Sequence, residues 1–144
     1  MNTYRGNGKT NIALWTVTGL LAAMFLFSGS AKLAASESMV QSYAAWGYPF
    51  WFLFVVGAGE VAGALLLLWR RTASLAGVAL GGIMVGAVGT HLFAGEYGAS
   101  VVPFLLCVLL GLVAYSRRGD FRWLRTPTET QAATGQPHFS GAPQ

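Results

Sequence analysis

Four long apolar segments, separated by short polar ones, dominate the pattern of the chain. They run from Ile12 to about Ala31, from Phe50 to Trp69, from Ala73 to Phe93 and from about Gly98 to Ser116. A helix needs roughly 20 apolar residues to cross the hydrocarbon core of a bilayer, and each segment comes close to that length. Lipid offers no hydrogen-bond partner to exposed backbone groups, so such segments cross as helices. The pattern predicts an all-α integral membrane protein, a four-helix bundle over residues 12–116.

The segment between the first two spans is too polar to cross a membrane but has a helical pattern of its own. Within residues 36–47 the apolar side chains recur at spacings close to one face of a helix: Met39, Val40, Tyr43, Ala44 and Trp46. A helix of this kind lies along the membrane surface. We predict a short outer interfacial helix, with aromatic rings at headgroup depth from Tyr43, Trp46, Tyr48 and Trp51.

Positive charges are distributed unevenly between the two ends of the predicted spans. Arg5 and Lys9 precede the first span, residues 70 and 71 join the second to the third, and residues 117, 118, 122 and 125 follow the fourth. Lys32 is the single cation of nine on the other side. Because Lys and Arg in short loops remain in the cytoplasm, we predict that the N-terminus (1–11) and the C-terminus (117–144) are cytoplasmic.

The two ends of the chain carry further expectations. From Thr126 onward there is almost no large apolar residue, so residues 117–144 are predicted to be mostly disordered. At the other end, Arg5 and Lys9 before an apolar stretch also fit a secretory signal peptide, whose removal would leave three spans. The apolar stretch exceeds the usual signal length of about 7–15 residues, which favours a first membrane span.

Composition agrees with the membrane interpretation and narrows the chemistry. The chain is 54% hydrophobic and 10% charged, whereas soluble domains carry about 25% charged residues. Its one cysteine, Cys107, excludes an internal disulfide, a Cys-x-x-Cys pair and a cysteine-built zinc site. The net charge of +4 does not indicate nucleic acid, because the cations lie at the ends of apolar runs. We therefore predict the lipid bilayer as partner, no nucleic acid, no metal site and no catalytic residue set.

One ionisable residue lies near the middle of a predicted span. Glu60 is about ten residues from either end of the second span, where a carboxylate is costly to insert. The positions one helical turn away are Val56, Gly57, Gly63 and Ala64, a mostly small face that suits packing against other helices. Glu60 is therefore expected to face the bundle interior and to mark a candidate intramembrane polar site.

Lys32 and His91 are the candidate partners of Glu60, with Ser28 and Thr90 in support. If the spans are straight helices, Glu60 lies about 10 Å deeper than His91 and Lys32 sits at the outer boundary. A direct Lys32–Glu60 ion pair then requires Lys32 to reach downward or the second span to be displaced. Two other interpretations stay open: a single structural hydrogen bond at Glu60, and Lys32 and His91 as markers of the headgroup level.

Small residues recur at helical spacing on two of the predicted spans. They are Gly59 and Gly63 on the second span, and Ala79, Gly82, Gly86 and Gly89 on the third. Helices in lipid approach most closely where side chains are small. We therefore expect both sets to be packing faces between helices.

The placed polar residues carry a family resemblance. Residues 27–33 read Phe-Ser-Gly-Ser-Ala-Lys-Leu, residues 57–63 read Gly-Ala-Gly-Glu-Val-Ala-Gly, and residues 90–92 read Thr-His-Leu. Over roughly residues 13–115 the chain resembles the DoxX-like family of small bacterial four-helix membrane proteins. Lys32, Glu60 and His91 match the polar positions of that family. A resemblance of this kind implies a fold more firmly than a reaction.

The resemblance also implies a functional setting, because the family takes its name from relatives associated with thiosulfate:quinone oxidoreductase. Other members are linked to soluble redox enzymes or to assembly. We expect a multi-pass protein of the cell inner (plasma) membrane that serves as an accessory subunit or assembly partner, with other membrane or redox proteins as partners and homo-oligomerisation left open. The alternative is a quinone-linked oxidoreductase component or a small proton-coupled transporter, with Glu60 and His91 relaying protons. No cofactor is required by the sequence, and quinone is the candidate.

Overall fold

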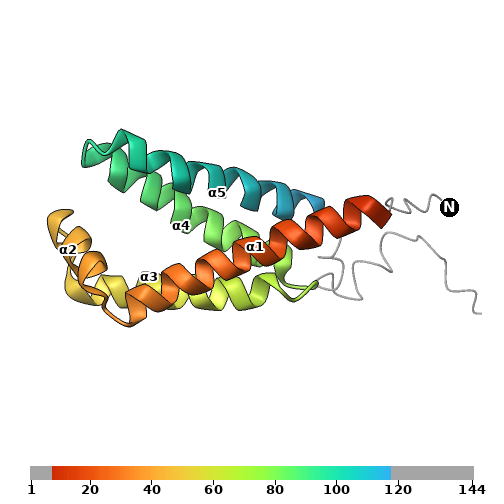
Figure 1. Cartoon of the computed structure of the whole chain (residues 1–144), viewed down its shortest axis with the longest axis horizontal. Coiled ribbons are helices and arrows are strands. Elements are labelled where there is room, and N and C mark those ends of the chain that lie inside the picture. Colours follow the sequence, from red (N-terminus) through yellow and green to blue (C-terminus); the bar gives the residue numbers. More distant parts are fainter. Residues whose placement is uncertain (1–7, 118–144) are drawn as a thin grey trace, which may run out of the picture.

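The computed structural model describes residues 8–117 and folds them into helices only. In chain order these are α1 (Gly8–Leu33), α2 (Glu37–Ala45), α3 (Phe50–Leu67), α4 (Ala73–Phe93) and α5 (Tyr97–Ser116) (Figure 1). Four of them, α1, α3, α4 and α5, are long and apolar enough to cross a membrane. This confirms the predicted all-α membrane bundle with a short additional helix. The predicted disorder of the C-terminal tail concerns residues that, beyond Arg117, lie outside the described part.

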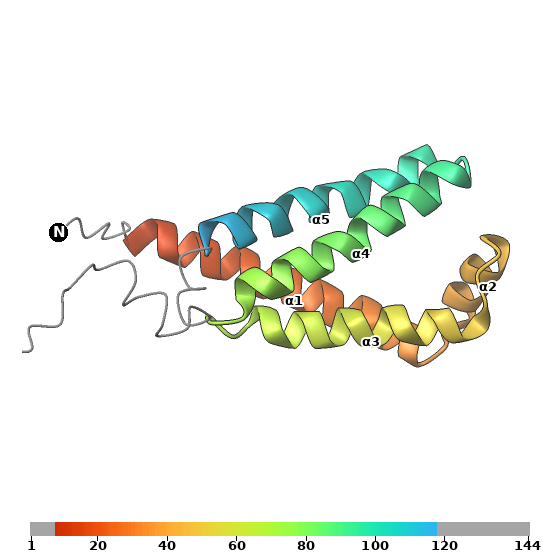
Figure 2. The ribbon, with the colours of Figure 1, turned by 180° about the vertical axis from the view of Figure 1, so that it is seen from behind.

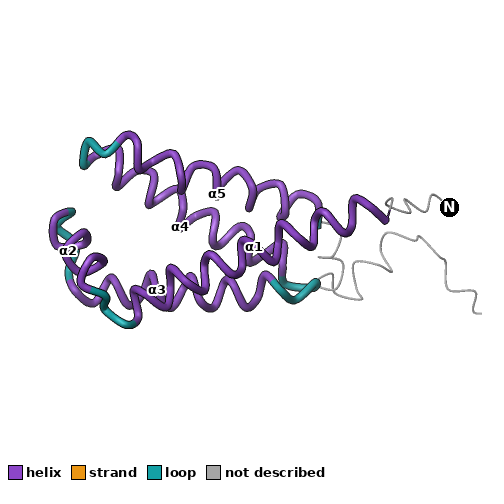
Figure 3. The backbone as a smooth tube through the Cα atoms, viewed as in Figure 1, coloured by secondary structure: helices purple, strands orange, loops and turns teal. Residues whose placement is uncertain are grey.

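The long helices form two antiparallel pairs. The most extensive contacts join α4 to α5 and α1 to α3, whereas α3 meets α4 over a shorter stretch. The pairs lie close together at the end that holds the α3–α4 turn, and they spread apart toward the end that holds α2 and the α4–α5 turn (Figure 2). Short loops connect the elements at both ends (Figure 3). We call the end with the α3–α4 turn the narrow end, and the end with α2 and the α4–α5 turn the wide end.

The apolar core fills the narrow half of the bundle. Its buried members come from all four long helices and include Leu21, Phe25, Leu67, Leu80, Leu110 and Val113. The helices approach closely here because Gly63 has no side chain. An added Cβ at Gly63 would lie only 2.6 Å from a methyl group of Leu80. The core thus joins both helix pairs at one end and leaves the other end to different contacts.

Polar contacts reinforce the narrow end. The Ser74 hydroxyl donates to the Ala114 carbonyl at 3.0 Å and so links the start of α4 to the end of α5. The buried Arg117 guanidinium lies over the Trp15 ring at 4.2 Å, and its Nη2 lies 3.5 Å from the Thr18 hydroxyl on α1. Interhelical hydrogen bonds of this kind stabilise membrane bundles where apolar surface alone gives no preference.

Large apolar side chains cover the outside of the four long helices. Phe27 is 81% exposed and Phe93 is 98% exposed, with Leu20, Trp51, Val85 and Phe104 also exposed. A soluble protein of this size rarely presents so many apolar side chains to water. The outer surface is therefore the lipid-facing surface of a multi-pass membrane protein.

Candidate functional site

A buried ion pair joins α1 to α3. The Lys32 ammonium donates to Glu60 Oε2 at 2.9 Å, to Glu60 Oε1 at 3.1 Å and to the Ser28 hydroxyl at 2.7 Å. Lys32 is 8% exposed and Glu60 is 2% exposed. An ammonium has three N–H donors, and here each has an acceptor. The structure thus brings three of the five candidate site residues into one hydrogen-bonded group.

The ion pair is direct because α1 and α3 are shifted along their axes. Gly29 packs against Gly57 so closely that an added Cβ would lie 2.8 Å from the Gly57 carbonyl oxygen, and a Cβ on Gly57 would lie 2.9 Å from Lys32 Cβ. From Gly57, α3 continues outward for seven residues to Phe50, about 10 Å of helix. Lys32 therefore lies well below the outer end of α3, not level with it, and its ammonium reaches Glu60 directly.

His91 and Thr90 lie apart from the ion pair, at the wide end of α4. His91 Nδ1 is 2.7 Å from Glu96 Oε2 in the α4–α5 turn, and its ring meets the Trp46 ring edge-on at 5.0 Å. His91 has no direct contact with Glu60 among the hydrogen bonds of the described residues. Lys32, Glu60 and His91 therefore do not form a single hydrogen-bonded group.

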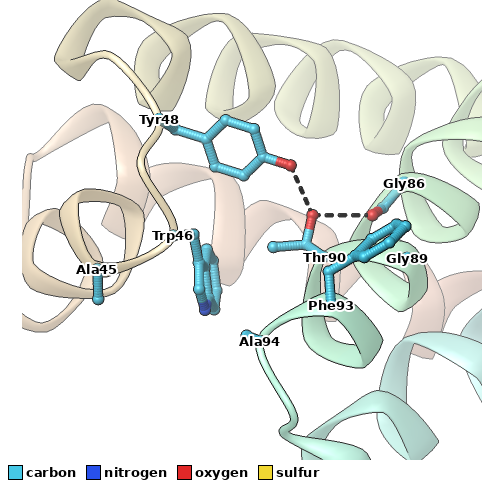
Figure 4. Close-up of a pocket in the computed structure, with 8 residues that line it drawn as sticks. All are labelled: Ala45, Trp46, Tyr48, Gly86, Gly89, Thr90, Phe93 and Ala94. Atoms are coloured by element: carbon cyan, nitrogen blue, oxygen red, sulfur yellow. Dashed lines mark hydrogen bonds between the residues drawn. The ribbon is translucent and has the colours of Figure 1, made fainter.

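Thr90 connects α4 to the segment that follows α2. Its hydroxyl donates to the Gly86 carbonyl at 3.0 Å, which leaves its oxygen to accept the Tyr48 O–H at 2.7 Å (Figure 4). Together with the Trp46–His91 contact, this bond ties the two helix pairs to each other at the wide end. We call these two contacts the bridge.

All five candidate site residues border one large cavity between the helix pairs. It has a volume of about 910 Å³ and is lined from every helix; Ser28, Lys32, Glu60, Thr90 and His91 contribute polar groups to its wall. Most of the remaining wall is apolar, from residues such as Met24, Val55, Ile83 and Leu106. The Lys32–Glu60 ion pair and the His91–Glu96 pair are thus two polar regions in the wall of a single, mainly apolar cavity.

An aromatic cluster in the cavity wall was not predicted as part of a site. Tyr43 is its centre, with ring centroids 5.5 Å from Trp46, 5.8 Å from Tyr48 and 6.4 Å from Phe52. The sequence predicted headgroup depth for Tyr43, and the structure shows in addition that it is 8% exposed and lines the cavity. The sequence feature that could have indicated this is the position of Tyr43 on the apolar stripe of the short helix. Such a stripe is consistent with burial against other helices as well as with contact to the membrane surface.

The Tyr43 hydroxyl has no hydrogen-bond partner among the described residues, although it borders the cavity. Burial, and to a smaller extent the negative charge of Glu60 and the neighbouring Tyr48, raise the pKa of Tyr43 to about 12. The phenol is therefore neutral at physiological pH and offers one donor and one acceptor to the cavity.

Three glycines of the packing face expected on α4 do not pack against another helix, so the expectation for these three residues was wrong. An added Cβ at Gly82, Gly86 or Gly89 would meet nothing within 4 Å. Gly82 and Gly86 line the large cavity, and Gly86 and Gly89 line a second pocket of about 370 Å³ beside Trp46 (Figure 4). The missing side chains create the space between the helix pairs.

The remaining candidate for chemistry is Cys107. Its thiol lies 3.8 Å from the Gly81 carbonyl and packs beside the apolar core. In the part of the chain that the structure describes, no three His, Cys, Asp or Glu side chains are arranged to hold a metal ion. These contacts agree with a packing role for Cys107.

Comparison with known proteins decides the family. The model of the DoxX-like family matches residues 16–113, about two thirds of the chain. The chain belongs to the DoxX-like family. A relative, "Uncharacterized protein YdgD" of Bacillus subtilis (strain 168), is 31% identical over 98 residues, which cover 65% of this chain and 86% of that protein. No solved structure matches the chain significantly.

The DoxX-like match covers the site as well as the fold. It begins in α1 and ends in α5, so it contains every residue that lines the large cavity, from Met24 to Leu106. The cavity is therefore built within the family domain and not from the segments that flank it.

Proposed function

We propose that this DoxX-like protein is an accessory subunit or assembly partner in a bacterial inner membrane, without catalytic activity of its own, and that its cavity holds a small ligand. The observation that carries the proposal is the 910 Å³ cavity, whose buried charges are already paired with each other. A site with this arrangement suits binding better than proton transfer.

The ion pair supports a structural role for Lys32 and Glu60. A general acid or base must hold a proton that it can exchange with a substrate. The three Lys32 donors are directed at Ser28 and Glu60, and both Glu60 oxygens accept from Lys32. Because both groups are engaged, the pair is suited to fix α1 against α3 and to shape the cavity floor.

The cavity itself supports ligand binding. Small-molecule sites have volumes of about 300–1,000 Å³ and are mainly apolar, with a few placed polar groups. The cavity fits this description in size and lining, and its polar groups gather at the wide end and at the ion pair. A membrane-dissolved molecule would find its apolar part matched and its polar part oriented.

Charge distribution supports the proposed orientation. Arg70, Arg71 and Arg117 lie at the narrow end, together with the start of α1 and the end of α5 (Figure 1). Since positive charges favour the cytoplasmic side, we place the narrow end in the cytoplasm and the cavity in the outer half of the membrane.

The proposal is tested by extracting the protein from native membranes in a mild detergent and identifying the proteins and small molecules that accompany it. Gly82→Leu fills the cavity where an added side chain meets open space, and Gly111→Leu makes the same change on α5 away from the cavity. We expect a bound molecule that Gly82→Leu removes and Gly111→Leu retains. Turnover of a substrate by the purified protein alone, abolished by Glu60→Gln, would contradict the proposal.

A second candidate function is a quinone-linked oxidoreductase component. The observation in its favour is that the unpartnered Tyr43 hydroxyl and the apolar wall lie on the same cavity, so a quinone carbonyl would find a donor and its tail would find apolar surface. Stoichiometric quinone in the wild type that is lost in Gly82→Leu would favour this function. A transporter is less well supported, because the apolar core closes the narrow half around Phe25 and Leu80.

A further inference from the structure

The cavity wall holds two carboxylates and one ammonium, so with a neutral His91 it carries more negative than positive charge. Its charged lining residues are Lys32, Glu60 and Glu96, with His91 beside Glu96. Lys32 neutralises Glu60, so Glu96 and its hydrogen-bonded imidazole determine the charge at the wide end. Since all three Lys32 donors are engaged, an anionic ligand would find no free ammonium here.

Aromatic faces add to the negative character of the same region. The rings of Tyr43, Trp46, Tyr48 and Phe52 form one cluster in the cavity wall, and Trp46 contacts His91, the hydrogen-bond partner of Glu96. The face of an aromatic ring is electronegative and attracts organic cations. The same walls are largely hydrocarbon, so a cation with an apolar body is favoured over a hydrated metal ion.

Tyr43 gives an independent indication of this preference. Tyr43 is 8% exposed and lines the cavity, and its hydroxyl has no hydrogen-bond partner among the described residues, so its oxygen is available to accept from an N–H group. Its pKa is raised to about 12 by burial and then by the Glu60 charge and by Tyr48.

We propose that the cavity binds an amphiphilic organic cation, with its charged group against the Tyr43–Trp46–Tyr48 cluster near Glu96 and its apolar body along Val55, Gly82 and Ile83. This inference rests on the proposed ligand-binding function. The ligand class is an ammonium or similar organic cation attached to a hydrophobic group. It has two natural sources: the headgroup of an amine-bearing lipid, or a free lipophilic cation.

The test compares two probes of nearly equal shape and opposite charge, tetraphenylphosphonium and tetraphenylborate. Equilibrium binding is measured on the full-length protein in an uncharged maltoside detergent, with protein-free micelles as the background. We expect saturable binding of tetraphenylphosphonium and at least roughly tenfold weaker binding of tetraphenylborate, because the anion meets Glu96 and the aromatic faces without a free cation.

Variants assign the binding to the aromatic cluster and to Glu96. We expect Trp46→Leu to weaken tetraphenylphosphonium binding by roughly three- to thirtyfold, the range of a desolvated cation–π contact. Glu96→Gln should weaken it severalfold and reduce its dependence on salt. Glu37→Gln removes a carboxylate from an exposed position of α2 outside the cavity and should leave binding unchanged.

The lipid arm of the experiment identifies the source of the cation. Phosphatidylethanolamine is added to the micelles in one series and phosphatidylglycerol, which has no ammonium, in the other. Competition by phosphatidylethanolamine alone assigns the site to a lipid headgroup, and lack of competition by either assigns it to a free lipophilic cation. Both results agree with the proposal, since both require a cation in the cavity.

Two results overturn the inference. The first is binding of tetraphenylborate as tight as that of tetraphenylphosphonium. The second is cation binding that is unaffected by both Trp46→Leu and Glu96→Gln. If a neutral or anionic molecule nevertheless accompanies the protein and is lost in Gly82→Leu, the ligand-binding function stands and the ligand class is wrong. If Gly82→Leu removes no bound molecule and neither probe binds, both the proposed ligand-binding function and this inference are wrong.

Discussion

Lys32 and Glu60 form a buried ion pair, at a place where either charge without its partner would be strongly unfavourable. Removing one partner of a buried pair leaves a charge without compensation, whereas replacing both by apolar groups is much less costly. In a bilayer this asymmetry is reinforced, because a single charge at mid-span is expensive and a pair of methionines is not. The pair therefore couples the stability of α1 to that of α3.

A double-mutant cycle tests this coupling. We expect Lys32→Met or Glu60→Met alone to destabilise the protein by about 3–5 kcal/mol and the double variant to cost less than the sum of the two. Thermal unfolding in detergent, followed by circular dichroism, gives the comparison. Additive effects of the two single changes would show that the side chains are not coupled.

The residues of the ion pair could be chosen from the sequence, but their contact could not. Glu60 is conspicuous as a carboxylate in an apolar run, and Lys32 as the one cation on the wrong side for the charge pattern. Their meeting depends on the axial shift set by Gly29 against Gly57, which is a tertiary contact between helices far apart in sequence. The place of Tyr43 in the cavity wall could not be predicted for a related reason, since the apolar stripe on α2 does not show which residues cover it.

At the scale of the helices, glycines that look alike in the sequence have opposite roles. On α1 and α3, Gly29, Gly57 and Gly63 allow close approach, whereas on α4 Gly82, Gly86 and Gly89 leave open space. Spacing within one helix gives the face on which residues lie but not what lies opposite. The sequence therefore predicted the helices and their small faces, and the structure was needed to separate packing from cavity.

Alanine substitutions separate the two kinds of glycine. Gly29→Ala places a Cβ 2.8 Å from a backbone oxygen and should destabilise the protein by about 1–3 kcal/mol. Gly82→Ala meets nothing within 4 Å and should be neutral or stabilising by up to about 1 kcal/mol, because alanine favours helix. Unfolding temperatures of the two variants in one detergent provide the measurement. Equal losses would mean that α1 and α3 do not approach as described.

For the whole molecule, the division into a packed end and an open end determines how the cavity is reached. At the wide end the helix pairs are joined by the bridge, the Tyr48–Thr90 hydrogen bond and the Trp46–His91 contact. Tyr48, Thr90, Trp46 and Gly86 line both the large cavity and the smaller pocket, so the bridge lies in the wall between them. Loosening the bridge would join the two spaces.

Loss of the Tyr48 hydroxyl should make the cavity more accessible. A net hydrogen bond contributes about 0.5–1.5 kcal/mol, so Tyr48→Phe should increase the open population by roughly two- to tenfold. The readout is the rate at which a maleimide labels Gly82→Cys in a Cys107→Ser background. Tyr97→Phe, an equivalent change at an exposed position outside the cavity, should leave the rate unchanged. An unchanged rate in Tyr48→Phe would exclude the bridge as a barrier.

The orientation of the whole molecule is tested by labelling intact cells. Single cysteines are placed at Ser38 in α2 and Ser116 at the end of α5, both exposed, in a Cys107→Ser background. A membrane-impermeant maleimide should label Ser38→Cys in intact cells and Ser116→Cys only after lysis, because the narrow end carries the cations. The reverse pattern would place the cavity in the inner half of the membrane.

The separation of the core from the cavity also has a consequence for how relatives can diverge. The residues that hold the fold, such as Leu67, Leu80 and Leu110, belong to the buried cluster in the narrow half, while much of the cavity wall at the wide end faces open space. A change in that wall alters the shape and charge of the space without removing core packing. One scaffold can therefore accept many mutations at its binding end and give rise to proteins with different ligands, while remaining folded in the membrane.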